Sequence, residues 1–513
     1  MSVPAHDLNA VCDVLAECAC SGDPAIAGLF NTGQPLLLAR APGRLDVMGG
    51  FADYSGSLTL ELPIREAAYV AVQRRSEPWV EVVSAGFGPG AGPRRRARFE
   101  LGELERHSRS YADAHEYFAR DARHAWAAYV AGALVALRLE LDRPLGSGLS
   151  LLVASSVPEG KGVSSSAALE VASLSALAGA CGVSIDPVRS ALICQRIENL
   201  VVGAPCGVMD QMTSSCGSEG QLLPLLCQPA ELQPGLPLPA ALALWGIDSG
   251  LRHEVSGADY GEVRVAAFMG YRWLADVRGL SARATERAGL VAIDDPEWGG
   301  YLARLARAEF DRRYRELLPE RCSGAEFLQR FGGITDPITA VRDAVTYRVR
   351  AATEHPVYEH ARASEFRQLL ESPELGAVRA EGRQRALLER LGALMYETHQ
   401  SYSACGLGST GTDRIVELVR ELGPERGLYG AKITGGGSGG TVAVLGRADA
   451  MPAVQAVVQR YARETGRVPQ LFAGSSPGAA AFGVRRIEHG AGGWRLASKS
   501  REVLGSGADG AES

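Results

Sequence analysis

Short apolar runs separated by glycine and proline turns fill the chain from residue 36 to residue 101, and this pattern predicts strands over 36–40, 58–64, 67–72, 80–83 and 97–101. A helix with one buried face follows, because apolar residues recur at helical intervals from Trp126 to Leu137. The chain is expected to be mainly helical from residue 259, with a long helix over 381–399. Two late strands are predicted at 431–434 and 441–445.

The length of 513 residues exceeds what one ordinary core needs, so two domains with extensions are expected. Apolar residues at helical spacing (Val11, Leu15, Cys18) predict a helix in the first part of the chain. The stretch 221–239 is expected to be loop and edge, and a strand over 241–247 is expected to close the first domain. The predicted limits are an N-terminal helical extension over 1–33, domains over 34–245 and 246–487, and a mostly disordered tail over 488–513, which ends without apolar residues.

Composition limits the classes of partner. With 46% hydrophobic and 22% charged residues, a net charge of −6 and no apolar run of membrane-spanning length, the chain offers no reason to expect a nucleic acid or membrane partner. The ten cysteines show no paired CxxC spacing, so we expect reduced thiols and no zinc site. Because the N-terminus lacks the pattern of a signal peptide, the protein is expected to be cytoplasmic.

The stretch from residue 149 to residue 180 has the order of parts that a phosphate site needs. An apolar strand is followed by a glycine turn, three serines and a helix of small residues, whose first amides would point at an anion. Gly162 follows Lys161 where a Walker A loop needs Ser or Thr, and Ser165 stands where a dinucleotide fingerprint needs glycine, so neither motif fits. The candidate phosphate-binding residues are Pro158, Gly160, Lys161, Gly162, Val163, Ser164, Ser165, Ser166 and Ala167.

The chain contains three glycine-rich motifs, over 41–54, 158–168 and 432–440, and the loop 206–211. In this order and at these separations they resemble the superfamily of galactokinase, homoserine kinase, mevalonate kinase and phosphomevalonate kinase, over residues 35–487. Within it, further runs at 257–261, 267–270, 354–358 and 402–409 resemble the L-arabinokinases of plants. The resemblance implies an α+β fold of two domains, an ATP-binding first domain like domain 2 of ribosomal protein S5 and a ferredoxin-like second domain.

The resemblance also implies roles for polar residues outside the glycine loop. Asp210 matches the catalytic base, although a helix cap is its alternative role, and Arg44 matches the arginine that pairs with that base. A cation beside a carboxylate keeps it ionised, so this pair suits proton abstraction during phosphoryl transfer from ATP. Glu198, twelve residues before Asp210, matches a magnesium-binding glutamate, with Ser165 or Ser166 as the hydroxyl ligand.

Two groups keep alternative roles at this point. Lys161 either reaches a phosphate or is a solvated loop lysine. The glycine run 435–440 is expected to let two backbone segments approach the phosphate loop, with direct contact of Gly436 and Gly437 to the nucleotide as the alternative. Tyr260 matches a tyrosine that galactokinases place against the sugar, although an aromatic core role fits it equally.

The sequence departs from the galactokinase pattern at one place, where Gly50 and Phe51 replace Glu-His within a motif that otherwise continues through Asp53 and Tyr54. In galactokinases the glutamate binds the hydroxyl on the exocyclic carbon of the sugar. L-Arabinopyranose lacks that carbon, so the glutamate would be buried without a partner, whereas Asp53 can still bind ring hydroxyls. The expected function is therefore phosphorylation of the anomeric hydroxyl of a monosaccharide, L-arabinose first, by a monomer or weak homodimer. A galactokinase and a non-catalytic sensor of sugar and ATP are the alternatives.

Overall fold

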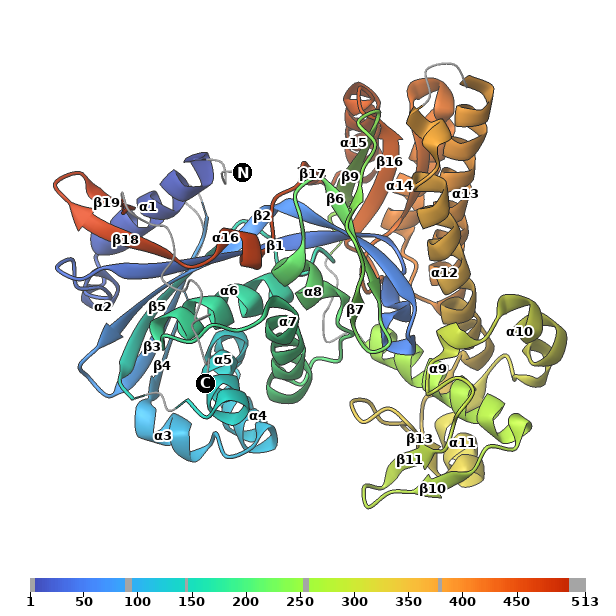
Figure 1. Cartoon of the computed structure of the whole chain (residues 1–513), viewed down its shortest axis with the longest axis horizontal. Helices are drawn as coiled ribbons and strands as arrows, with labels where there is room; N and C mark the ends of the chain where they lie inside the picture. Colours follow the sequence, from blue (N-terminus) through green and yellow to red (C-terminus); the bar gives the residue numbers. More distant parts are fainter. Residues whose placement is uncertain (1–4, 88–94, 144–145, 252–257, 377–380, 498–513) are drawn as a thin grey trace, which may run out of the picture.

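The computed structural model describes residues 5–87, 95–143, 146–251, 258–376 and 381–497 of the chain. Two sheets and their covering helices form its frame (Figure 1). None of the helices in these ranges combines the length and the apolar character that a membrane crossing needs.

The first sheet contains ten strands in the order β19-β18-β1-β2-β5-β3-β4, and β6 to β8 branch from β2. Helices α5 and α6 pack against one face of this sheet and share its largest hydrophobic core, whereas the N-terminal helix α1 packs against the other face (Figure 1). The strand bounds are β1 Leu36–Met48, β2 Leu58–Arg75, β3 Trp79–Ala85, β4 Arg95–Glu100, β5 Gly148–Ser155, β6 Gln221–Leu226, β7 Glu231–Leu232, β8 Leu236–Pro237, β18 Arg485–Gly490 and β19 Gly493–Leu496. The helices of this half are α1 Ala5–Ala19, α2 Pro24–Ala27, α3 Leu101–Arg106, α4 Tyr111–Ala119, α5 Ala128–Leu141, α6 Ser165–Ala180, α7 Pro187–Arg196, α8 Met209–Cys216 and α16 Ala479–Phe482.

Most early elements confirm the predictions, and three differ. The two strands predicted over 58–64 and 67–72 are one strand, β2, which pairs with β1 on both sides of a register shift between Pro42 and Arg44. The stretch 221–239 was expected to be loop and edge but contains β6, which pairs with β2 from Leu58 to Glu61. Residues 488–496 were expected to be disordered, yet they complete the hairpin β18-β19, which pairs with β1. The rest of the predicted tail, 498–513, lies outside the described residues.

The second sheet has four strands in the order β15-β16-β9-β17. Its strands are β9 Leu242–Asp248, β15 Leu428–Ile433, β16 Thr441–Arg447 and β17 Leu471–Ala473, and it packs against α13 Glu381–Cys405, α14 Thr410–Leu422 and α15 Met451–Thr465. The expectation that the strand over 241–247 closes the first domain is wrong, because β9 pairs with β16 along its whole length. Its buried side chains Trp245 and Ile247 belong to the core of the second sheet.

A third hydrophobic cluster forms around the long helices α9 Ala258–Arg278 and α12 Val349–Leu370. Residues 279–348 between them form short elements, which lie below and to the right of α9 (Figure 1). The sequence predicted helices there and missed the small strands. The elements are β10 Ala282–Ala284, β11 Gly289–Ile293, α10 Arg307–Arg313, β12 Cys322–Ser323, α11 Gly324–Phe331, β13 Gly333–Ile334 and β14 Thr346–Tyr347.

A buried ion pair joins the two sheets. Lys432 Nζ on β15 lies 2.6 Å from Asp46 Oδ2 on β1, and both side chains are fully inaccessible to solvent. Asp46 also accepts hydrogen bonds from the backbone N–H groups of Gly50 and Gly435, while its own N–H donates to Thr434 Oγ1. Because such charges are expensive to bury singly, each of these residues requires the other.

We expect Asp46→Asn to lower the free energy of unfolding by about 3–5 kcal/mol, the cost of leaving a buried charge unpaired. Urea unfolding followed by circular dichroism measures it. Arg447→Gln is the matched control, since it breaks the exposed Arg447–Asp449 pair on β16 and should change stability by less than about 1 kcal/mol. Equal effects of the two substitutions would contradict a structural role for the buried pair.

Candidate functional site

An arginine and an aspartate from different elements meet at the edge of the first sheet. Asp210 lies in the first turn of α8, and Arg44 lies on β1 at a register shift against β2. Arg44 Nε and Nη2 lie 2.9 and 2.8 Å from Asp210 Oδ1, and Nη1 donates to the carbonyl of Gly162 at 2.8 Å. The predicted pairing of these two residues is confirmed. Asp210 retains 22% exposure, so a ligand can reach it, whereas Arg44 is buried.

A second carboxylate balances the charge of Arg44. Glu61 on β2 is fully buried, and its Oε2 lies 3.3 Å from Arg44 Nε. Burial raises the pKa of Glu61 well above its ordinary value, the charge of Asp46 raises it further, and Arg44 lowers it. Burial alone would lower the pKa of Arg44, but Asp210 and Glu61 raise it above its ordinary value. Arg44 is therefore a permanent cation beside Asp210.

The glycine loop between β5 and α6 has the conformation of an anion cradle. Gly160 and Gly162 have φ angles of 70° and 71°, and Ser164 adopts the left-handed conformation at φ 60°, where a side chain is strained. The Ser164 hydroxyl is buried and has no hydrogen-bond partner among the described residues. The first amides of α6 follow directly. Strain, an unpartnered hydroxyl and a helix N-terminus together suit a phosphate.

The glycine run 435–440 supports this loop by close backbone approach. A Cβ atom at Gly435 would lie 2.9 Å from the carbonyl of Gly162, and one at Gly440 would lie 2.8 Å from the carbonyl of Lys161. The first of the two predicted roles for this run is thus the one observed. Gly437 is buried against Leu407, and Gly436 is half-buried. Whether these two residues also contact a ligand remains a prediction.

Lys161 has a partner that the sequence did not suggest. Its Nζ lies 2.6 Å from Asp248 Oδ2 at the end of β9, and Asp248 is almost completely buried. The description of Lys161 as a solvated loop lysine is therefore wrong, since its side chain is only 19% exposed. The pair connects the phosphate loop to the second sheet. A role of Lys161 toward phosphate stays a prediction.

The remaining loop residues differ in exposure. Val163 and Ala167 are buried in the first domain, where the carbonyl of Val163 accepts the N–H of Arg44. Pro158 and Ser165 are half-buried. A ligand contact of Val163 would therefore have to be made by its backbone, and such a contact remains a prediction.

Two carboxylates lie beside the start of α6. Glu198, in a π-helical turn after α7, accepts a hydrogen bond from the Ser166 side chain and another from Gln211 Nε2 at 2.5 Å. Burial raises the pKa of Glu198 to about 7, and Asp210 contributes to this rise. Glu170, one turn beyond Ser166, accepts from the same Gln211 amide at 3.3 Å, and its Oε1 is buried without a partner among the described residues.

This donor set fits Mg²⁺, which prefers oxygen ligands and takes one or two protein groups besides phosphate and water. The Ser166 hydroxyl and the Glu198 carboxylate already touch, as two ligands of one ion would. No cluster of three or more His, Cys, Asp or Glu side chains suited to a metal occurs in the described ranges, so a metal here would complete its shell with nucleotide oxygens and water.

Asp53, in the short helix Gly50–Ser55, is 4% exposed and lies close enough to Asp210 to be affected by its charge. Burial raises its pKa to about 7, with Asp210 adding to the rise and Arg264 opposing it. Its carboxylate accepts hydrogen bonds from the backbone N–H groups of Tyr54 and Met209. Gly207 is required beside it, because a Cβ atom there would overlap the Asp53 carboxylate.

Gly50 and Phe51 are core residues of the same short helix. Gly50 has a φ angle of 53°, and a Cβ atom would overlap the hydroxyl of Tyr402, which donates to the Gly435 carbonyl at 2.7 Å. The Phe51 ring stacks on His355 at 3.8 Å and is 1% exposed. The space behind Gly50 is therefore filled by Tyr402, a neighbour that the sequence did not reveal. Contact of either residue with a substrate remains a prediction.

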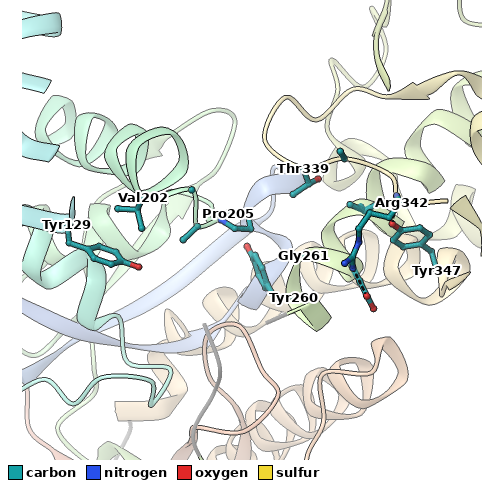
Figure 2. A pocket seen from close by; sticks show the side chains of 13 residues that line it. Tyr129, Val202, Pro205, Tyr260, Gly261, Thr339, Arg342 and Tyr347 are labelled. Carbon is teal, nitrogen blue, oxygen red and sulfur yellow. Dashed lines mark hydrogen bonds and ion pairs between the residues drawn. The ribbon is translucent and has the colours of Figure 1, made fainter. Parts of the chain in front are cut away.

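Tyr54 and Tyr260 pack edge to face at 6.2 Å, and the buried Tyr54 hydroxyl has no hydrogen-bond partner within the described ranges. Tyr260 also lines a cavity of about 530 Å³. Figure 2 shows Tyr129 and Tyr347 at the two ends of this cavity, with Pro205 and Tyr260 between them. The cavity lies against the loop that leads to Asp210, and Tyr260 is shared between both.

Sequence reasoning missed three buried polar residues of this region: Arg264, Glu170 and Asp46. Glu170 carried a usable signal, since it follows Ser166 by four residues on a helix and so shares its face. Asp46 lies inside a recognised motif, but its partner is almost four hundred residues away. Arg264 carried no local signal, because its partners come from the segments around Cys206 and Asp336.

Solved structures share this fold. The galactokinase of Lactococcus lactis in complex with galactose superposes with a TM-score of 0.66 at 19% identity, covering 92% of this chain and 98% of that one. The mevalonate kinase of Methanococcus jannaschii gives 0.52 at 12% identity, covering 86% and 98%. The fold is therefore that of a two-domain small-molecule kinase.

Sequence comparison narrows the class. The model of the GHMP kinases N terminal domain matches residues 128–218, that of the GHMP kinases C terminal domain matches 384–464, and the galactokinase galactose-binding signature matches 28–74. The chain thus contains both GHMP kinase domains, the N terminal and the C terminal one, as its motifs predict.

Two relatives lie within this family. The L-arabinokinase of Arabidopsis thaliana is 44% identical in an alignment 505 residues long that covers 90% of this chain, and the chain spans about half (48%) of that protein. The galactokinase of Chloroflexus aggregans is 28% identical, covering 85% of this chain and 90% of that protein.

We expect Gly207→Ala to lower the free energy of unfolding by about 2 kcal/mol, because the added methyl group overlaps the buried Asp53 carboxylate. In an Asp53→Ala background the same substitution should cost much less, and a double-mutant cycle in urea measures the coupling. Gly261→Ala is the control, since nothing lies within 4 Å of its Cβ position on α9. A coupling of zero would contradict the described contact.

Proposed function

We propose that this protein is an ATP-dependent sugar 1-kinase, which transfers the γ-phosphoryl group of ATP to the anomeric hydroxyl of a monosaccharide. The observation that supports it most is the pair of Arg44 and Asp210 next to the glycine loop, with Asp210 partly exposed and Arg44 also bound to the loop carbonyl of Gly162. One contact network thus connects a base to a phosphate cradle, which is what in-line phosphoryl transfer needs.

In the proposed reaction Asp210 accepts the proton of the anomeric hydroxyl. The oxygen of that sugar hydroxyl attacks the γ-phosphorus of ATP. The new O–P bond forms as the bond from the γ-phosphorus to the β-bridging oxygen breaks, and ADP leaves with that electron pair. Arg44 pairs with the Asp210 carboxylate before the step and compensates the charge on the transferred group during it. Asp210 then returns its proton to solvent.

Ser166 and Glu198 are the residues that would hold Mg²⁺, with Ser165 as the alternative hydroxyl. When bound, the ion would neutralise charge on the triphosphate. Gln211 orients the Glu198 carboxylate through its amide. Glu170 lies behind them and completes the hydrogen-bonding of that amide.

L-Arabinose is the sugar we propose. Tyr402 occupies the space beside Gly50, so this position has no acidic side chain that could bind an exocyclic hydroxymethyl group. Asp53 and Tyr260, which lie near each other, are the residues that we propose bind the ring hydroxyls. The similarity to a plant protein named L-arabinokinase supports the same choice. The galactose-binding signature keeps D-galactose as the second candidate.

We further propose that the enzyme acts in the cytoplasm as a monomer or weak homodimer, without nucleic acid or membrane partners. Its net charge of −6 supports the absence of nucleic-acid binding.

Asp210→Asn should lower kcat by about 10²-fold or more, because the amide cannot accept the proton. Coupled measurement of ADP release at saturating ATP and sugar tests this. The amide keeps the size of the side chain, and unchanged melting temperatures would separate loss of the base from loss of folding. Wild-type turnover in this variant would refute the role of Asp210.

A panel of L-arabinose, D-galactose, D-glucuronic acid and D-galacturonic acid tests the substrate. We expect the highest kcat/KM with L-arabinose, because the position of the galactokinase glutamate carries only Gly50 here. A preference for D-galactose would replace the proposed sugar by the second candidate. Absence of ADP release with every sugar would instead favour a non-catalytic sensor.

A further inference from the structure

Arg264 on α9 is buried between three segments of the chain. Its Nε and Nη2 donate to Asp336 Oδ2 and Oδ1 at 2.7 and 2.9 Å, which is a bidentate pair, and its Nη1 donates to the carbonyl of Cys206 at 3.0 Å. The side chains of Arg264 and Asp336 are 6% and 1% exposed. The guanidinium carbon lies 5.2 Å from the centre of the Tyr54 ring.

The carbonyl that Arg264 holds belongs to the loop that leads to the catalytic aspartate. The Asn199 side chain forms two hydrogen bonds with the backbone of the same residue. Its amide donates to the Cys206 carbonyl at 3.2 Å, and its oxygen accepts the Cys206 N–H at 2.9 Å. Gly207 follows and leaves space for Asp53, and Asp210 begins the next helix. A shift of this carbonyl would therefore move both carboxylates of the site.

Arg264 also acts on Asp53 through its charge. Burial and the like charge of Asp210 raise the pKa of Asp53, and Arg264 is the cation that lowers it. The groups around Asp53 come from several elements: Asp210 on α8, Arg264 and Tyr260 on α9, Tyr54 in its own short helix, and Cys227 after β6. Without Arg264, a larger fraction of Asp53 would be protonated at neutral pH.

The partner of Arg264 lies in the segment between α9 and α12. Asp336 follows β13, and it accepts hydrogen bonds from the N–H groups of Ile338 and Thr339 and from the Thr339 hydroxyl. The carboxylate is thus fixed in its loop before it holds the arginine. Thr339 also lines the cavity beside Tyr260 (Figure 2).

We propose that Arg264 is a positioning residue for sugar binding, through which the segment 279–348 fixes the loop 203–208 and with it the Asp53 carboxylate. This inference rests on the proposed function. The sugar hydroxyls need an acceptor at a fixed position, and the Asp53 carboxylate occupies the space that Gly207 leaves open directly after the carbonyl that Arg264 holds. A bidentate pair suits this task, because its planar geometry fixes the guanidinium in one orientation.

The test compares Asp336→Asn with the double variant Arg264→Gln/Asp336→Asn. The first keeps the cation, and the second removes it without leaving an unpaired buried carboxylate. kcat/KM for the sugar is measured against pH at saturating Mg·ATP, so that Glu198 stays occupied by metal. Since an acceptor is lost when Asp53 takes a proton, kcat/KM of the wild type should fall as the pH drops through about 7.

The double variant should raise KM for the sugar about tenfold or more relative to Asp336→Asn. It should also shift the acidic limb, which is the fall of kcat/KM at low pH, upward by about one pH unit, the effect of losing one nearby opposite charge. KM for ATP should change little. Arg264→Lys, which keeps the charge and loses the bidentate geometry, should keep the limb near its wild-type position while KM for the sugar rises.

Arg278→Gln is the matched control on the same helix, because Arg278 forms only an exposed pair with Glu297. An equal KM and an equal acidic limb in the double variant and in Asp336→Asn would overturn the inference. A rise in KM for ATP as large as that for the sugar would also overturn it, since this would indicate a structural role alone. If the wild type fails to release ADP with every sugar of the panel, the proposed function itself fails. That result would be known before any variants are compared.

Discussion

The buried pair of Asp46 and Lys432 is the constraint on which the rest of the site depends. It fixes β1 of the first sheet against β15 of the second, and each strand leads directly into an element of the candidate site. Asp46 precedes the short helix with Asp53, and Lys432 precedes the glycine run. The pair thus sets the distance between that helix and the glycine run, a distance that loops alone would not hold constant.

Close backbone packing and crowded negative charge complement each other around this pair. Glycines at 207, 435 and 440 let carbonyls, amides and carboxylates approach more closely than any side chain would allow. Burial of the carboxylates gathered by this packing raises the pKa of Asp53 and Glu198 to about 7, and the charge of Asp210 adds to both rises. Arg264 opposes the rise at Asp53, and hydrogen bonds from Ser166 and Gln211 oppose it at Glu198.

The sequence revealed what is local and missed what is distant. Glycine positions and the pairing of Arg44 with Asp210 follow from short motifs and family resemblance, and the structure agrees. The assignment of β9 to the second sheet does not follow, because strand partners are chosen by tertiary contacts and not by propensity. For the same reason the contacts of Arg264 and Tyr402 could not be predicted, because their partners come from segments far along the chain. Roles toward bound ligands remain predictions for every residue.

The position of β18 has a consequence for how the protein is made. Its residues pair with the beginning of β1, from Leu36 to Leu38, although the chain visits the second sheet in between. During synthesis the ribosome must therefore release almost the whole chain before the first sheet can gain its last strands. Until then the edge of β1 is open, and an open strand edge invites pairing with other chains. The nascent protein should therefore depend on chaperones until β18 has paired with β1.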